Sequence, residues 1–332
     1  MNKELGQLIQ RAANAMSAEQ TIVGGLASDT PRFALFHAAA SICSQKVRCV
    51  LAYHRIPYSS HLVDIFAGET YQPDYIRLRM LGCIAQGGAL ASHHSGSTAA
   101  RSEGFDGAVV PTLVDLTGGQ IVVDSRAICT WLDTLAIRGQ SLRPPLLATA
   151  IDRELAIVDE LPNYQLLMGR SQSADGSLPD EEAMAAFSRR KVGMCDELIA
   201  RYPDDPAIVA ACSAKRAKEL SAAEQLFTSE AMERARWAIE AALIRLDGAL
   251  ANSLGPFLFG AAPTLADLMW AIEIIRIKDV GQVRIWGDEY LPHIAAFEMA
   301  ASSLPAIRAA VLDWPGALLR PVNTNSNLET SC

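Results

Sequence analysis

The order of strand-like and helix-like segments constrains the fold of this chain more than any other feature, because every convincing strand lies before residue 124. Short apolar segments bounded by turn residues predict strands at 32–37, 60–65, 109–115 and 120–123. Helical periodicity predicts helices at 45–54, 71–79 and 126–135. From residue 148 only amphipathic helices follow, at 148–169, 180–201, 206–227, 229–252, 264–279 and 290–313. The sequence therefore predicts an α/β first half and an all-α second half.

This order divides the chain into five segments. A predicted helix at 3–16 and a glycine-containing stretch at 21–29, interpreted as a loop, form an N-terminal extension over 1–30. We expect the α/β domain at 31–138, a linker at 139–147, the helical domain at 148–320 and a tail at 321–332. Residues 81–107 are rich in Gly, Ser, Ala and His and predict a long surface loop.

Charge and motif content exclude several classes of function. The chain has 29 Lys and Arg against 37 Asp and Glu, a formal net charge of -8, so we expect no nucleic-acid partner. No G-x-G-x-x-G follows the first strand, which excludes a dinucleotide-binding sheet. Glu273 and Arg276 interrupt the most apolar segment, and the N-terminus lacks a signal-peptide pattern. We therefore expect no membrane association and a cytoplasmic location, where the seven scattered cysteines would be free thiols.

Cys43 is the residue whose position most favours chemistry. It lies between the first predicted strand and the first predicted helix. Backbone N–H groups and the dipole at a helix N-terminus stabilise an anion, and so favour the reactive thiolate form of a cysteine. The alternative is that Cys43 is a small buried core residue. The hydroxyls of Ser41 and Ser44 on either side favour the thiolate, because each can donate a hydrogen bond to the sulfur.

Two residue pairs further along the chain are candidates for binding a peptide-like ligand. Val110-Pro111 begins a strand at the place where a thioredoxin-like fold has a cis peptide bond that turns backbone groups toward a bound peptide. Asp124-Ser125 opens a helix, where the hydroxyl and free N–H groups suit an α-carboxylate and the aspartate suits an α-ammonium. The simpler alternatives are an ordinary edge-strand proline and a plain N-cap.

Together these features resemble the glutathione transferase superfamily, in which a Val-Pro-Thr-Leu segment and an Asp-Ser pair hold the backbone of glutathione. Thr264 and Asp267 are similar to the capping box of the superfamily's second domain, which makes them a folding element. Within the superfamily, the chain most resembles the glutathione-dependent reductive dehalogenases of chlorinated hydroquinones. This similarity spans nearly the whole chain, is patchy in the middle of the second half, and rests on residues 31–33, 35–37, 41–48, 75–79, 102–106 and 266–270.

The resemblance implies a thioredoxin-like first domain, an all-helical second domain, glutathione as co-substrate and a homodimer. It implies that glutathione is bound by Ser44, Val110, Pro111, Asp124 and Ser125. Glutathione thiolate would displace halide from a ketone tautomer of the ring, and Cys43 would then attack the thioether sulfur to form a mixed disulfide. Ser41 would orient or polarise the reacting groups.

The expected substrate is a small aromatic molecule bound near Ala39, Ala40 and Trp270, and Arg276 of the same predicted helix as Trp270 is also expected to be able to reach it. Small side chains at 38–40 replace bulkier ones in the relatives, which predicts a wider aromatic pocket. Two other functions remain open. One is glutathione-dependent cleavage of β-aryl ethers, in which Ser41 or Ser44 activates glutathione and no cysteine is needed. The other is a non-catalytic protein that binds an aromatic ligand or a partner chain.

Several conspicuous residues receive no predicted function. His93 and His94 are interpreted as part of a solvated loop, because neither has a partner at metal-ligand spacing, and no metal site is expected. The basic run at 189–191 is interpreted as an ordinary solvated helix face. Three tryptophans on helical faces are expected in the core: Trp237, Trp270 and Trp286.

Overall fold

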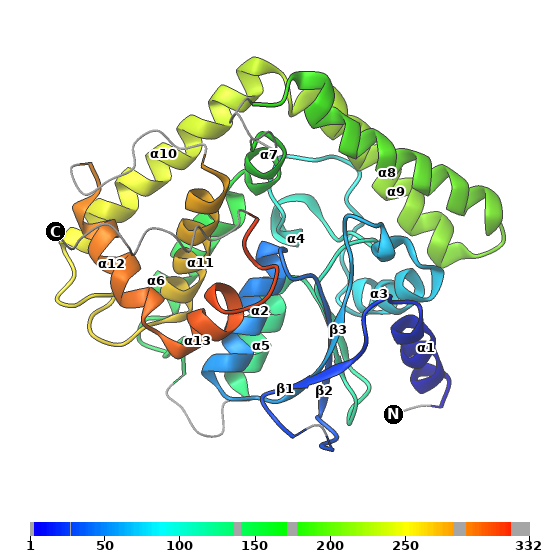
Figure 1. Ribbon diagram of the computed structural model, residues 1–332, viewed down its shortest axis with the longest axis horizontal. Coiled ribbons are helices and arrows are strands. Elements are labelled where there is room, and N and C mark those ends of the chain that lie inside the picture. The colour runs from blue at the N-terminus through cyan, green and yellow to red at the C-terminus, as the bar shows by residue number, and fades with distance from the viewer. Residues whose placement is uncertain (1–2, 27, 136–140, 171–177, 282–289, 320–332) are drawn as a thin grey trace, which may run out of the picture.

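The computed structural model describes residues 3–26, 28–135, 141–170, 178–281 and 290–319 (Figure 1). Its five-stranded sheet has the order β1-β3-β2-β4-β5. The strands are β1 (Thr21–Val23), β2 (Phe33–His37), β3 (Tyr58–Leu62), β4 (Thr112–Asp115) and β5 (Ile121–Val123). The pairing of β2 with β3 is parallel, and the other three pairings are antiparallel. All four predicted strands are therefore confirmed.

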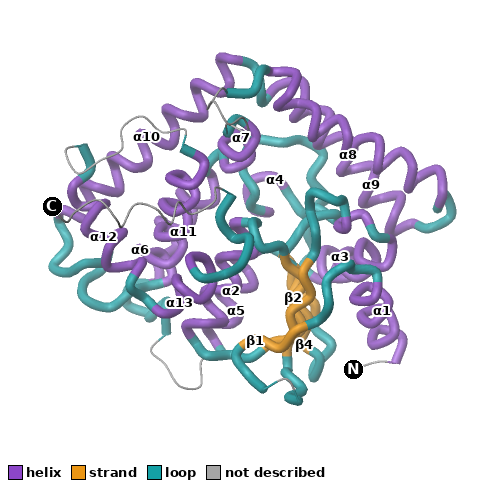
Figure 2. The backbone as a smooth tube through the Cα atoms, viewed as in Figure 1, coloured by secondary structure: helices purple, strands orange, loops and turns teal. Residues whose placement is uncertain are grey.

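The strand β1 corrects the prediction of a loop at 21–29. Its three residues pair with residues 58–60 of β3 and extend the sheet by one edge strand. The β-branched Thr-Ile-Val sequence favours extended backbone, although the run is too short to stand out beside the glycines that follow. In Figure 2 the strands gather in one region, and helices make up most of the remaining chain.

The two faces of the sheet are covered by different helices. Side chains alternate along a strand, so Phe33 and Leu35 of β2 face one core and Ala34 and Phe36 face the other. The first core includes residues of α2 (Ile42–Tyr53) and α5 (Ser125–Thr134), and the second includes residues of α3 (Pro73–Ala85) and α1 (Lys3–Asn14). Two short turns complete this half: η1 (Glu69–Tyr71) and α4 (Ala100–Glu103).

The second half is helical throughout its described residues. Its elements are α6 (Ala148–Glu160), α7 (Asn163–Met168), α8 (Glu181–Arg201), α9 (Pro206–Gln225), α10 (Ser229–Ala251), α11 (Leu265–Val280), α12 (Pro292–Ser302), α13 (Pro305–Ile307) and the π-helical turn η2 (Arg308–Leu312). In the described chain no single helix is long and apolar enough to cross a membrane. Two consecutive helical segments, Pro292–Ser302 and Pro305–Leu312, reach that length and apolar character only when they are taken together, and they are bent by 77° relative to each other.

The central helix α11 joins the two halves through one hydrophobic core. Its Trp270 and Ile274 are fully buried, and the same core reaches Leu35 in the sheet and Val50 in α2. The helix begins at the predicted capping box, in which the backbone N–H of Thr264 donates to Asp267. The predicted combination of a thioredoxin-like α/β half with an all-α half is confirmed.

Prolines break two of the predicted helices. The predicted helix at 148–169 is interrupted at Leu161, which is extended (φ -62°, ψ 136°) before Pro162. The predicted helix at 290–313 is interrupted in the same way at Leu304 (φ -67°, ψ 127°) before Pro305. The residue before a proline is sterically excluded from the helical region, which accounts for both breaks.

Two further predictions are wrong because burial differs from expectation. Trp237 on α10 is 63% exposed and therefore lies outside the core. The segment 81–107 contains the end of α3 and the short helix α4, and several of its side chains, including His94 and Ser97, are buried. It is therefore a packed segment rather than a surface loop. Trp286, residues 139–140 of the expected linker and the tail at 321–332 lie outside the described residues.

Candidate active site

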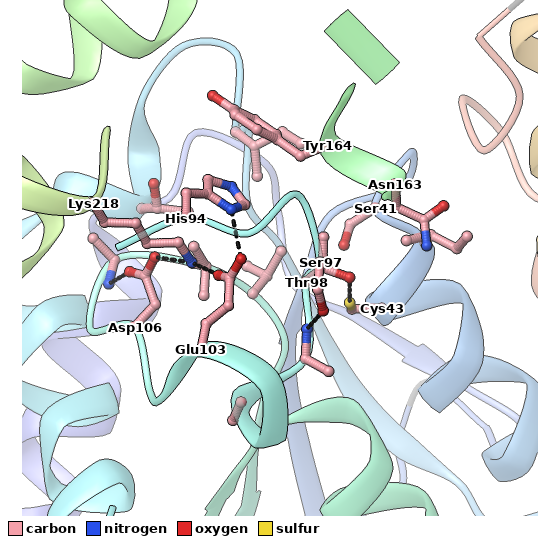
Figure 3. A pocket seen from close by; sticks show the side chains of 18 of the residues that line it. Ser41, Cys43, His94, Ser97, Thr98, Glu103, Asp106, Asn163, Tyr164 and Lys218 are labelled. Atoms are coloured by element: carbon pink, nitrogen blue, oxygen red, sulfur yellow. Dashed lines mark hydrogen bonds and ion pairs between the residues drawn. The ribbon is translucent and has the colours of Figure 1, made fainter. Parts of the chain in front are cut away.

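Cys43 occupies the first turn of α2, two residues after the N-cap. Ser41 is the N-cap residue, and its Oγ accepts a hydrogen bond from the backbone N–H of Ser44 at 3.3 Å. Cys43 is 8% exposed, and its Sγ donates to Oγ1 of Thr98 at 3.4 Å (Figure 3). The thiol therefore points from the N-terminus of α2 toward the segment at 81–107.

A cleft brings Cys43 together with most of the predicted site residues. Val110 and Pro111 line it beside Cys43, and the peptide bond between them is cis, as the sequence predicts. The other predicted residues that line the cleft are Ala40, Ser41, Asp124 and Ser125. Among the cysteines of the described residues, Cys43 alone lines this cleft. The sulfur therefore has a groove beside it, despite its low exposure.

Three predicted site residues lie away from this cleft. Ser44 is fully buried, and its Oγ accepts a hydrogen bond from the backbone N–H of Ala38 at 3.2 Å. Ala39 lines a second, separate cavity, which it shares with Ala40. Trp270 is fully buried because α11 is the central core helix, and its Nε1 donates to Glu154 at 3.0 Å. The interpretation of Trp270 as a substrate-contacting residue is therefore corrected, and it is part of the core.

Asp124 connects the segment at 81–107 to the start of α5. It is the N-cap residue of α5, with φ 75°, and its Oδ1 accepts from the backbone N–H of Ala127 at 3.0 Å. Its Oδ2 accepts from the backbone N–H of Ala100 at 3.0 Å. A carboxylate has about four lone-pair sites, so Asp124 can still accept a hydrogen bond from a ligand in the cleft.

A buried ion pair lies one helical turn after Cys43. Lys46 is three residues along α2, and its Nζ is 2.7 Å from Glu273 of α11. Burial alone lowers the pKa of Lys46, but the attraction of Glu273 and of Cys43 outweighs it and raises this pKa overall. Asn163 also donates to Glu273, at 3.2 Å. Lys46 therefore places positive charge near the sulfur and is itself held by the helical half.

Of the two residues of α11 expected to reach the substrate, Trp270 and Arg276, only Arg276 lines the cleft. It lines the same cleft as Cys43, and its guanidinium donates to the backbone carbonyl of Ala40 at 2.5 Å. Burial lowers the pKa of Arg276, although Asp279 and Cys43 act in the opposite direction.

Arg79 fixes the strand that carries the cis proline. This buried side chain donates to the backbone carbonyl of Asp106 at 2.6 Å, to that of Pro111, and to Oγ1 of Thr112 at 3.0 Å. The C-terminal end of the segment between α3 and β4 is thereby tied to a guanidinium of α3. Arg79 acts as a positioning residue for this side of the cleft.

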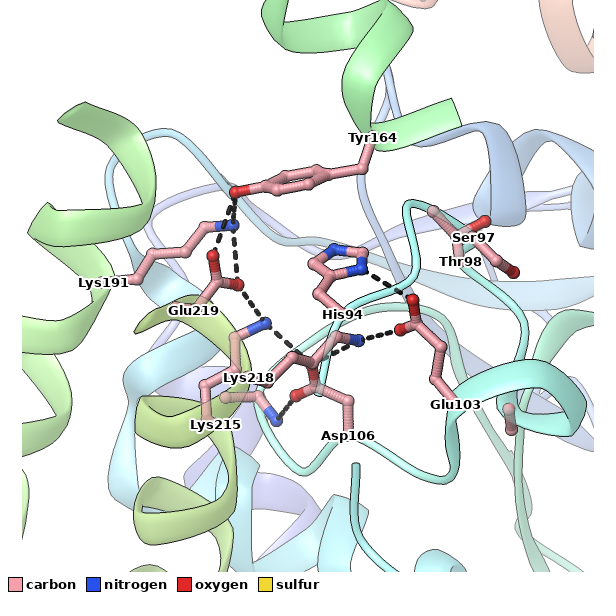
Figure 4. A network of polar contacts seen from close by, with 12 residues as sticks. His94, Ser97, Thr98, Glu103, Asp106, Tyr164, Lys191, Lys215, Lys218 and Glu219 are labelled. Atoms are coloured by element: carbon pink, nitrogen blue, oxygen red, sulfur yellow. Dashed lines mark hydrogen bonds and ion pairs between the residues drawn. The ribbon is translucent and has the colours of Figure 1, made fainter. Parts of the chain in front are cut away.

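A network of buried charges lines the part of the cleft formed by 81–107 and α9 (Figure 4). His94 and Glu103 are 2.6 Å apart, and Lys218 lies 2.7 Å from Glu103. Burial opposes ionisation of Glu103, but His94 and Lys218 lower its pKa to about 2. The interpretation of His94 as part of a solvated loop is therefore wrong.

The network continues into α8 and α9. Lys215 lies 2.7 Å from Asp106 and 2.8 Å from Glu219, and Lys191 lies 3.1 Å from Glu219. Lys191 also donates to the hydroxyl of Tyr164 at 3.0 Å. The interpretation of 189–191 as a solvated face is thus wrong for Lys191, whose side chain is 15% exposed. The spacing of Lys215 and Glu219 by four residues was visible in the sequence, but the partner of Lys215, Asp106, lies 109 residues earlier and the partner of Glu219, Lys191, lies 28 residues earlier.

Comparisons with known proteins identify the family. Residues 40–135 match the model of the glutathione S-transferase N-terminal domain. The chain is 34% identical over 290 residues, 86% of its length and 84% of the relative's, to the 2,5-dichlorohydroquinone reductive dechlorinase of Sphingobium indicum. It is 25% identical over 291 residues, 87% of its length and 100% of the relative's, to the tetrachloro-p-hydroquinone reductive dehalogenase of Sphingobium chlorophenolicum.

Solved structures agree on the fold. The β-etherase LigF of Sphingobium sp. strain SYK-6 is 18% identical, with a TM-score of 0.53 over 84% of this chain and 98% of that one. The theta-class glutathione S-transferase of Xanthomonas axonopodis pv. citri, solved with glutathione bound, is 17% identical, with a TM-score of 0.50 over 85% and 97%. With these matches over most of its length, the chain belongs to the glutathione transferase superfamily and is related within it to the reductive dehalogenases of chlorinated hydroquinones.

Proposed function

We propose that this protein is a glutathione-dependent enzyme that reductively dehalogenates a halogenated hydroquinone through a mixed disulfide between Cys43 and glutathione. The observation that carries this proposal is the position of Cys43, at the N-terminus of α2 and in one cleft with the cis Val110-Pro111 pair. The similarity to a 2,5-dichlorohydroquinone reductive dechlorinase supports the class of substrate.

The proposed reaction consumes two glutathione molecules for each halogen removed. The first glutathione thiolate forms a C–S bond to the ring of a ketone tautomer, and the C–halogen bond breaks with release of halide. The Cys43 thiolate then attacks the thioether sulfur, so that an S–S bond forms, the C–S bond breaks and the ring carbon takes the electron pair and a proton. A second glutathione thiolate attacks the mixed disulfide, releases glutathione disulfide and restores Cys43.

The surrounding residues would bind glutathione and orient the reacting groups. Val110 and Pro111 would pair with its backbone, and Asp124 and Ser125 would hold its α-ammonium and α-carboxylate at the start of α5. The Oγ of Ser41 already accepts a backbone N–H, so its own proton can be donated to a sulfur anion. We propose that Ser44 supports the turn before α2 through Ala38, without touching glutathione.

Cleavage of β-aryl ethers is the second candidate, and the observation that favours it is the presence of the Ser41 hydroxyl in the cleft. In that reaction Ser41 would activate glutathione for direct attack on the ether carbon, and Cys43 would be dispensable. The two reactions therefore predict opposite outcomes for the same substitution, Cys43→Ser.

The test uses the full chain with glutathione and a panel of halogenated hydroquinones and β-aryl ethers. For reductive dehalogenation, Cys43→Ser should accumulate the glutathionyl aromatic and form none of the mixed disulfide that mass spectrometry detects in the wild type. Turnover of an ether that survives Cys43→Ser but not Ser41→Ala would establish the second candidate. If glutathione neither is consumed nor raises the thermal midpoint by mass action, both would be rejected in favour of a non-catalytic binding protein.

We further propose, from the superfamily resemblance, that the protein acts in the cytoplasm as a homodimer. Light scattering of the purified chain measures the mass directly. A mass near 35.7 kDa, that of one chain, would reject the dimer.

A further inference from the structure

The charged network in the cleft contains one lysine that is less completely neutralised than the others (Figure 4). Lys215 lies within 2.8 Å of both Asp106 and Glu219. Lys218 contacts Glu103 at 2.7 Å and Asp106 at 3.4 Å. Within the described chain, Lys191 has ion-pair contact only with Glu219, whose Oε1 also contacts Lys215. Of the three lysine side chains, that of Lys191 is also the most exposed, at 15%.

This arrangement makes Lys191 the lysine in the network that changes charge near neutral pH. Burial and the neighbouring Lys215 lower its pKa, the attraction of Glu219 and Asp106 opposes this only in part, and the result is about 8. The flanking groups keep their protonation states. Burial raises the pKa of Tyr164 well above its ordinary value and lowers that of His94, which stacks on Tyr164 with ring centroids 4.4 Å apart.

Aromatic side chains surround the Lys191 amine on the cleft side. Its Nζ lies 4.6 Å from the ring centroid of Tyr164 and 4.3 Å from that of Phe187. Phe66 packs on Phe187 with centroids 6.1 Å apart, and all three rings line the same cleft as Cys43. In Figure 3 Tyr164 and Lys218 lie on one side of this cavity and Cys43 on the other. Such walls suit a flat ring, with polar hydrogen-bonding groups at one end.

We propose that Lys191, together with the hydroxyl of Tyr164, binds a ring hydroxyl of the aromatic substrate and that the neutral Lys191 amine removes its proton. The phenolic O–H bond breaks, an N–H bond forms, and the electron pair remains on oxygen as a phenolate. Return of the same proton from Lys191 to a ring carbon completes the ketone tautomer in which glutathione displaces halide. The proton is conserved, and no other reactant is needed. This inference rests on the proposed function, because it assumes a hydroxylated aromatic substrate.

Buried ion pairs add little stability compared with apolar side chains of similar size, so stability alone does not account for six charges in this cleft. A proton acceptor whose pKa lies near the working pH typically contributes a factor of about 10²–10⁴ in rate. We therefore expect Lys191→Met to lower kcat/KM for a chlorinated hydroquinone by at least about 100-fold. Lys191→Arg keeps the positive charge beside Glu219 but cannot give up its proton in this pH range.

The experiment has two readouts. The first is the pH profile of kcat/KM, which should rise with an apparent pKa near 8 in the wild type and lose this rise in Lys191→Arg.

The second readout needs no turnover. S-methylglutathione and a chlorophenol are added, and the ultraviolet difference spectrum reports whether the bound ring is phenol or phenolate. The wild type should bind a monochlorophenol as phenolate at pH 8, and Lys191→Met, which supplies neither a positive charge nor a proton acceptor, should bind it as neutral phenol. Arg189→Met, an exposed change on the same helix, is the control and should match the wild type in both.

The outcomes separate this inference from the proposed function. A phenolate spectrum that is unchanged in Lys191→Met, or a wild-type enzyme that binds neutral phenol, overturns the role of Lys191 even where Cys43-dependent turnover is intact. A wild type that binds the phenolate through Lys191 but forms no mixed disulfide at Cys43 overturns the proposed reaction and leaves the binding role standing. A wild type that binds no phenol at all overturns both.

Discussion

At the scale of single residues, Lys46 and Glu273 show how the helical half supports the start of α2. Both side chains are almost completely buried, at 6% and 0% exposure, and their charged atoms are 2.7 Å apart. Removing a charge from water is expensive, so each ion is stable in this position only because the other is present. The pair therefore couples the helix that carries Cys43 to the core helix α11.

We expect Glu273→Met and Lys46→Met each to lower the free energy of unfolding by about 3–5 kcal/mol, because each leaves an unpaired buried charge. The double variant, which removes both charges, should be more stable than either single variant. Urea unfolding followed by circular dichroism measures all three. Lys278 and Glu298 form an exposed pair on α11 and α12, so Glu298→Met should cost no more than about 1 kcal/mol. If the double variant lost as much free energy of unfolding as the two single variants together, a direct charge interaction between Lys46 and Glu273 would be contradicted.

At the scale of elements, the segment at 81–107 is held over the cleft by close packing as well as by charge. Gly96 has φ 96°, and its carbonyl accepts the backbone N–H of Tyr164 at 3.1 Å. A Cβ at this position would lie 2.2 Å from Oε1 of Gln165. Gln165 has little room to move, because it is buried and its Nε2 donates to two backbone carbonyls of the helical half.

Gly96→Ala should therefore displace this segment. Arg101 is exposed within it, and we expect trypsin to cut after Arg101 several times faster in the variant than in the wild type. Mass spectrometry of timed digests measures the rate. Gly87→Ala is the matched control, since Gly87 also has positive φ (67°) but no atom lies within 4 Å of its added Cβ. Equal cleavage of the two variants would show that backbone conformation, and not the contact with Gln165, determines the effect.

The sequence predicted those elements whose signals are local. Helix periodicity identified α8 to α11 nearly to their ends. Cys43 was correctly expected at the N-terminal end of the first helix, although α2 begins three residues earlier than predicted, at Ile42, and so includes Cys43. The segment at 81–107 was misread because its Ser, Gly and His residues usually indicate solvent. His94 is buried with its Nδ1 against Glu103, and the charge of Glu103 is balanced by Lys218, more than 100 residues away, which no local pattern shows. The cleft residues on α7, α8 and α9 were missed for the same reason.

At the scale of the whole molecule, two buried carboxylates connect the α/β half to α9, and a third connects α9 to α8. Glu103 and Asp106 belong to the first half, Glu219 belongs to α9, and each contacts a lysine of the helical half. For all three, burial opposes ionisation, but the nearby cations lower the pKa below the ordinary value of 4.5 or 3.8. These buried charges therefore form part of the contact between the two halves of the protein.

The pH dependence of stability follows from the direction of these shifts. A carboxyl group whose pKa is lower in the folded state binds its proton first in the unfolded chain, so the unfolded chain binds more protons at acid pH. The stabilisation is fully present above about pH 4.5 and is lost as the pH falls toward 2, with a slope of about 1.4 kcal/mol per pH unit for each group. His94 acts in the same direction from a higher pH, because burial lowers its pKa below 6.5 and its protonation also favours unfolding.

We expect Asp106→Asn to be less stable than the wild type at pH 7, since Lys215 loses a carboxylate at 2.7 Å, and to lose stability less steeply below pH 4.5. The slope should decrease by about one proton, which corresponds to about 1.4 kcal/mol per pH unit. Urea unfolding at pH 7, 5, 4 and 3 measures both quantities. Asp204→Asn, at an exposed position beside α9, should keep the wild-type slope. If the free energy of unfolding fell with the same slope below pH 4.5 in Asp106→Asn and in the wild type, the network would not bind the two halves through its charges. Only a carboxylate that stays ionised in the folded state makes this slope steeper.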